Sequence, residues 1–127
     1  MENPVINFQC QFTEMQLDFI GQSVVRAASQ VCGDKLRDVI IYGSYALGDF
    51  HEWSDVDIMV LADTDENECR VIDDLLMRTL IELDNRMNLL LYIAVTPYDR
   101  FERMKDVYPL YRNVDREGKR LCPIPVA

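Results

Sequence analysis

The chain has 127 residues, of which 49% are hydrophobic, and this length suggests one domain with a buried core. The formal net charge of −9, from 22 acidic and 13 basic residues, repels a phosphate backbone and argues against duplex nucleic acid as a partner. No segment approaches the ~20 apolar residues of a membrane span, and the start "MENPVINFQCQF" lacks the features of a signal peptide, so we expect a cytoplasmic protein.

The cysteines are scattered along the chain and form no C-x-x-C pair, which argues against a zinc site. We predict reduced and mostly buried thiols. The residues concerned are Cys10, Cys32, Cys69 and Cys122.

Helical spacing of apolar residues from Thr13 to about Val31 predicts a first helix, with Gly33 at its C-terminal stop. "DVIIYG" and "VDIMVLA" each read as a buried strand. After "DTDENE" a second helix is expected, with an apolar stripe on one face. That stripe comprises Val71, Ile72, Leu75, Leu76, Leu80 and Leu83.

"NLLLYIAVT" is a third run of strand length, closed by Pro97. A short helix over 97–104 and a last helix from Pro109 to near Gly118 are expected to follow. Alternating helices and buried strands indicate an α/β fold, with helices packed on a small mixed sheet of three to four strands. We interpret 1–127 as a single domain, with a core over about 13–121.

The stretch "YGSYALGDFHEWSDVDIMVLA" places two acids on an apolar strand, shortly after a glycine-serine turn. Strand side chains alternate, so Asp55 and Asp57 point to the same side while Val56 and Ile58 face the core. Carboxylates about 7 Å apart repel each other unless a cation such as Mg²⁺ lies between them. A D-x-D pair taken alone is more often a solvated pair on an edge strand.

The glycine-serine turn supplies a complementary feature. Gly43 lets the backbone approach a ligand closely, and Ser44 adds a hydroxyl beside a turn that can present N–H groups to an anion. Turn and acids together predict one site, in which the turn holds a triphosphate and the aspartates hold the metal.

These residues resemble a known family. "GSYALGDFHEWSDVDIMV" is similar to the G-S-x-A-x-G…S-D-x-D signature of the DNA-polymerase-beta-like nucleotidyltransferase superfamily, closest to its minimal nucleotidyltransferases. The resemblance implies that Gly43 and Ser44 contact the phosphates of an NTP, ATP first among them. It also implies that Asp55 and Asp57 are catalytic and bind two Mg²⁺ ions. The implied chemistry transfers a nucleoside monophosphate to a hydroxyl of a protein or small molecule and releases pyrophosphate.

Two positions depart from the family pattern. The third strand carries no Asp or Glu between Asn85 and Pro97, where active members place a third carboxylate, and Tyr92 is the polar group expected to face the site there. Leu47 replaces a common arginine. An alternative is therefore a catalytically impaired module that binds nucleotide or a partner.

Small members of this family work with a helical HEPN-type protein of toxin–antitoxin pairs, so the resemblance implies such a partner or a homo-oligomer. Arg112 and Arg116 lie one helical turn apart and suit either phosphate contact or ion pairs. Of these two roles, ion pairs are expected.

Overall fold

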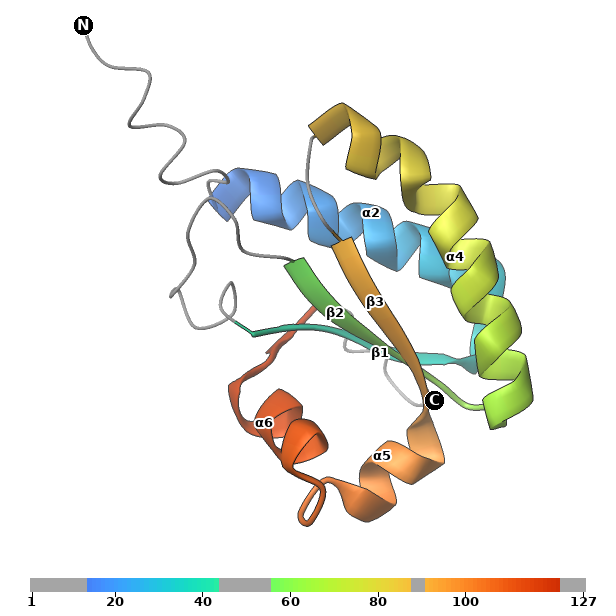
Figure 1. Ribbon diagram of the computed structural model, residues 1–127, viewed down its shortest axis with the longest axis vertical. Helices are drawn as coiled ribbons and strands as arrows, with labels where there is room; N and C mark the ends of the chain where they lie inside the picture. Colours follow the sequence, from blue (N-terminus) through green and yellow to red (C-terminus); the bar gives the residue numbers. More distant parts are fainter. Residues whose placement is uncertain (1–13, 44–55, 88–90, 122–127) are drawn as a thin grey trace, which may run out of the picture.

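The computed structural model describes residues 14–43, 56–87 and 91–121. Four helices, a short 3₁₀ turn and four strands occupy these ranges (Figure 1). In chain order they are α2 (Glu14–Cys32), η1 (Gly33–Lys35), β1 (Leu36–Tyr42), β2 (Val56–Ala62), α4 (Glu66–Met87), β3 (Leu91–Pro97), α5 (Tyr98–Met104), α6 (Pro109–Glu117) and β4 (Lys119–Arg120).

The strands form one mixed sheet in the order β3-β2-β1-β4. β1 runs antiparallel to both β2 and β4, whereas β2 and β3 are parallel. The predicted α/β class and small mixed sheet are confirmed. β4 consists of two residues, and both are exposed. A strand this short has no apolar pattern from which it could be predicted.

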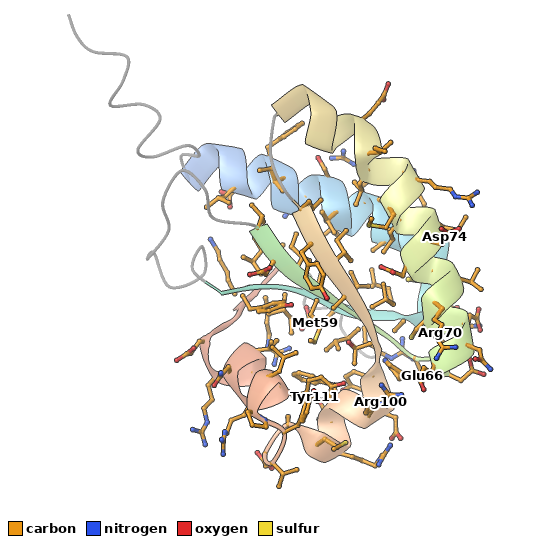
Figure 2. All side chains as sticks on the ribbon, in the orientation of Figure 1. Met59, Glu66, Arg70, Asp74, Arg100 and Tyr111 are labelled. Carbon is orange, nitrogen blue, oxygen red and sulfur yellow. The ribbon has the colours of Figure 1, made fainter. Side chains whose placement is uncertain are left out.

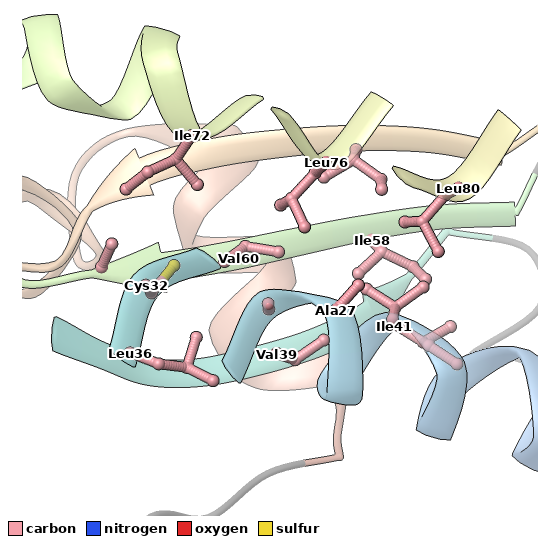
Figure 3. Packing of buried hydrophobic residues seen from close by; sticks show 14 of the residues in the cluster. Ala27, Cys32, Leu36, Val39, Ile41, Ile58, Val60, Ile72, Leu76 and Leu80 are labelled. Carbon is pink, nitrogen blue, oxygen red and sulfur yellow. The ribbon is translucent and has the colours of Figure 1, made fainter. Parts of the chain in front are cut away.

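Helices cover both faces of the sheet (Figure 1). α2 and α4 pack on one face, where every second residue of β2 joins the main core, including Val56, Ile58 and Val60 (Figure 3). This confirms the face predicted for these residues. α5 and α6 pack on the other face around Met59 and Leu61.

The stripe expected on α4 is partly wrong. Ile72, Leu76 and Leu80 are buried as predicted, but Val71 and Leu75 are 57% and 42% exposed. Each exposed residue lies about 100° around the helix from a buried neighbour, so it points away from the sheet. The side chain of Leu83 lies outside the described residues.

The other sequence-based boundaries are close to those observed. α2 ends at Cys32, and Gly33 follows with a positive φ of 61°. Pro97 ends β3 and precedes α5 rather than lying within its first turn. Cys32 and Cys69 are buried free thiols, as expected, whereas Cys10 and Cys122 lie outside the described residues.

A partly buried ion pair links the end of the described chain to β1. Asp38, whose side chain is 9% exposed, accepts a hydrogen bond of 2.6 Å from Arg120. Arg120 also donates to Asp115 of α6 at 2.8 Å. Arg120 of β4 is therefore paired with one carboxylate on β1 and with another on α6, and it links these three elements.

We expect Arg120→Gln to lower the free energy of unfolding by about 2–3 kcal/mol, since it leaves a buried carboxylate without its cation. Lys119→Gln is the matched control on the same strand. Its contact with Asp18 spans 3.9 Å between side chains that are 57% and 67% exposed, so a loss below about 0.5 kcal/mol is expected. Urea unfolding measures both, and equal losses would contradict the assigned role of the buried pair.

Candidate functional site

Gly43 and Asp57 lie against each other at one end of the β1–β2 pair. Gly43 adopts a φ of 79°, a left-handed conformation that other residues reach only at a cost. A Cβ placed on it would lie 2.6 Å from Oδ2 of Asp57. The missing side chain is therefore what lets this carboxylate sit against the end of β1.

A row of three polar side chains crosses the sheet at this point. Tyr42 on β1 pairs with Asp57 on β2, and Asp57 pairs with Tyr92 on β3. Paired residues of neighbouring strands point to the same face, which here is the face opposite α2 and α4. Asp57 and Tyr42 are half-buried, and Tyr92 is 59% exposed.

The electrostatics of this row keep Tyr42 protonated. Burial raises the pKa of Tyr42 to about 12, and the nearby charge of Asp57 and then Tyr92 add to the rise. At neutral pH Tyr42 is therefore a neutral phenol that can donate a hydrogen bond but cannot serve as a general base. This role could not be predicted from the sequence, because a tyrosine at the end of a buried strand is normally a core residue.

Two of the four predicted site residues lie in the described chain. The structure brings Gly43 and Asp57 together, whereas Ser44 and Asp55 lie outside the described residues, as do Leu47 and the rest of the spacer. The described ranges hold no group of three or more His, Cys, Asp or Glu side chains that could bind a metal.

Tyr92 occupies the third-strand position beside Asp57, as expected from the sequence. No acidic residue lies on β3 as the structure defines it. At the position where the family resemblance implies a third carboxylate, β3 therefore carries a phenol, which is a hydrogen-bonding group.

The carboxylate of Asp57 is of the ligand type that a hard divalent cation prefers. Asp57 offers carboxylate oxygens at a strand end, and the adjoining backbone is bare at Gly43. Mg²⁺ prefers one or two carboxylates and fills its remaining positions with water and phosphate oxygens. Asp57, with Asp55 two residues before it in sequence, could provide those carboxylates.

The nucleotidyltransferase domain family matches residues 25–122. The chain belongs to this family. The enzyme class predicted from the sequence, a nucleotidyltransferase, is thereby confirmed.

Relatives and solved structures agree with this assignment. The "Putative protein adenylyltransferase MJ0604" of Methanocaldococcus jannaschii is 30% identical over 87 residues, which cover 68% of this chain and 79% of that protein. The fold resembles a crystal structure of a toxin-antitoxin with AMP-PNP, at a TM-score of 0.54 and 24% identity over 83% of this chain and 74% of the other. A mutant of the toxin-antitoxin MntA-HpeT gives a TM-score of 0.51 and 17% identity over the same shares.

The arginines of α6 do not behave as expected. In the part of the chain that the structure describes, neither Arg112 nor Arg116 forms an ion pair. The acid of α6 that is paired, Asp115, is held by Arg120 instead.

Among the described residues, no helix combines the length and the hydropathy that a membrane span requires.

We predict that Gly43→Ala lowers stability and displaces the Asp57 carboxylate. The left-handed backbone costs about 1–2 kcal/mol for a residue with a Cβ, and the added methyl collides with Oδ2. Affinity for Mg²⁺-AMP-PNP should fall by about tenfold or more, equivalent to about 1.4 kcal/mol. Isothermal titration calorimetry measures the affinity and urea unfolding measures the stability.

Gly33→Ala is the matched control. Gly33 also has a positive φ, 61°, but a Cβ added to it would meet no atom within 4 Å. It should show the same loss of stability from backbone strain, with unchanged affinity for the nucleotide. Equal loss of affinity in both variants would show that backbone strain, and not contact with Asp57, explains the effect.

Proposed function

We propose that this chain transfers AMP from ATP to a hydroxyl of a protein acceptor and depends on Mg²⁺ held by Asp55 and Asp57. The observation that carries the proposal is the carboxylate of Asp57 seated against the bare backbone of Gly43. Membership of the nucleotidyltransferase family supports nucleotide transfer as the reaction. The name of the relative from M. jannaschii supports adenylyl transfer to protein.

The charge of the chain explains why a cation is needed. With a formal net charge of −9, the protein and an NTP repel each other unless positive charge lies between them. Mg²⁺, when bound, would neutralise phosphate charge and polarise the reacting phosphoryl group. Asp55 and Asp57 would hold it, and two ions are expected from the family resemblance.

The remaining site residues position the nucleotide. Gly43 makes room for the Asp57 carboxylate, and its backbone and the hydroxyl of Ser44 would contact the phosphates, as the family resemblance implies. The acceptor oxygen attacks the α-phosphorus, the bond from that phosphorus to the bridging oxygen breaks, and pyrophosphate leaves while the hydroxyl proton is released. Most of the rate would come from positioning and charge neutralisation.

The acceptor is proposed to come from a partner protein. The solved structures of similar fold are toxin-antitoxin assemblies, which supports a protein partner of that kind. The family resemblance implies that this partner is a helical HEPN-type protein, and a homo-oligomer is the alternative.

A label-transfer assay tests this function. The full chain, with ATP labelled at the α-phosphate and Mg²⁺, should label a protein in an extract of its own cells and release pyrophosphate. Asp57→Asn should lower both signals by about 10²–10³-fold, as expected for removal of a charge that organises the transition state. Asp74→Asn is the control, because Asp74 is an exposed α4 carboxylate paired with Arg78 and should leave activity unchanged. Equal labelling by wild type and Asp57→Asn would refute the proposal.

One observation favours a second function, a module that binds nucleotide without turnover. Tyr92 stands beside Asp57 where the family resemblance implies a carboxylate, and loss of a positioned base costs about 10²–10⁴-fold in rate. Such a module would be stabilised by Mg²⁺-ATP, by about 2.7 kcal/mol at a concentration of 100 Kd, and would release no pyrophosphate. Thermal unfolding measured beside the label-transfer assay separates the two functions.

A further inference from the structure

The outer edge of β3 is an open strand edge. β3 is the terminal strand of the sheet and pairs with β2 along its whole length from Leu91 to Pro97. On its other side no strand pairs with it among the described residues. Its sequence, LYIAVTP, carries no charge, whereas natural edge strands usually bear charges or bulges that prevent pairing. The strand therefore offers backbone groups to an incoming chain.

A groove runs along this edge between β3 and α4. Its helical wall presents Glu66, Arg70 and Asp73, which recur about one turn apart on the same side of α4, and Tyr92–Val95 line it from the strand. The groove has a volume of about 220 Å³, below the ~300–1,000 Å³ of sites that enclose a whole small ligand. It suits one or two side chains of an extended peptide better than a nucleotide.

At one end of the groove one carboxylate lies within ion-pair distance of two arginines. Oε1 of Glu66 lies 3.1 Å from a guanidinium nitrogen of Arg100 on α5, and Oε2 lies 3.8 Å from one of Arg70. Figure 2 shows these three side chains close together at the start of α4. These arginines are therefore not free cations that await an anionic ligand.

Asp73 differs from its neighbours in the groove. Its Oδ1 atom is buried and accepts no hydrogen bond from the described residues. Burial and then the charge of Asp74 raise the pKa of Asp73. A buried acceptor without a donor is costly, and a cation placed in the groove beside the Asp73 carboxylate, which lines it, would offset part of that cost.

We propose that the β3–α4 groove binds an extended basic segment of a partner protein, which adds a strand to the β3 edge and donates a lysine or arginine N–H to Asp73. Strand addition of this kind draws affinity from backbone hydrogen bonds and specificity from side-chain pockets. A second copy of this chain is the less suitable occupant, because each copy carries a formal charge of −9 and the groove needs a donor.

The groove also adjoins the candidate site. Tyr92 lines the groove and pairs with Asp57 in the sheet, so a segment held on β3 passes close to that carboxylate. Delivery of an acceptor hydroxyl along this path rests on the proposed function, but binding of the segment does not.

An NMR titration without nucleotide or metal tests the binding. The probe is a blocked octapeptide that alternates lysine with valine or threonine, added to the ¹⁵N-labelled full chain. We expect saturable shifts concentrated in the amides of 91–96 and around Asp73. Asp73→Asn should raise the Kd by about tenfold, because a bond to a charged acceptor becomes a neutral one, whereas Asp74→Asn, next in sequence but paired with Arg78 on the exposed surface, should leave it unchanged.

Two further peptides test the roles of the positive charge and of backbone pairing separately. Replacing lysine by glutamate should weaken binding at least as much as Asp73→Asn does, and N-methylation of alternate residues should abolish it by blocking backbone pairing. Melting curves followed by circular dichroism confirm that both protein variants are folded. The proposal is overturned by an absence of saturable binding, by shifts that map away from β3, or by equal Kd values for the two variants. A dimer in sedimentation, together with β3 amides that are protected from hydrogen exchange, would assign the edge to a second copy instead.

Discussion

The antiparallel register of β1 and β2 is the constraint on which the rest of the molecule depends. Val39 and Ile41 on one strand and Ile58 and Val60 on the other all face the core beneath α2 and α4. A slip of one residue would turn these side chains to the opposite face, so burial fixes the register. The same register sets Tyr42 opposite Asp57 and brings the left-handed Gly43 against its carboxylate. The position of the acidic group is thus a consequence of apolar packing.

The two faces of the sheet carry different kinds of side chains. The face under α2 and α4 is a continuous apolar core, which holds the strands rigid. The opposite face is covered by α5 and α6 around Met59, Phe101 and Tyr111, and it also carries the row from Tyr42 through Asp57 to Tyr92. Rigid strands therefore present polar groups at the margin of a second, smaller core. Sites built on strands in this way hold their geometry more closely than sites built on loops.

Much of this arrangement could be predicted from the sequence because its signals are periodic and local. Alternation along "VDIMVLA" predicts Asp57 on the face opposite Val56 and Ile58, and the structure confirms it. Gly43 is predicted to let a ligand approach the backbone, whereas the contact that the structure shows there is with the carboxylate of Asp57. Other features depend on tertiary contacts that no local pattern encodes. Val71 and Leu75 read as part of an apolar stripe, yet only packing decides which side of α4 meets the sheet. The strand order that leaves β3 at the edge, and the orphaned oxygen of Asp73, likewise appear only when the elements are assembled.

We propose above that the Asp57 carboxylate, seated against Gly43, anchors a cation-dependent nucleotide site. A crystal structure of the full chain grown with Mn²⁺ and AMP-PNP tests it most directly, because anomalous scattering locates the ion without assumptions about the protein. We expect an anomalous peak within bonding distance of an Asp57 oxygen, with triphosphate oxygens on the same ion and beside Gly43. An ion and nucleotide bound elsewhere, with the Asp57 carboxylate engaged only by protein groups, would contradict it.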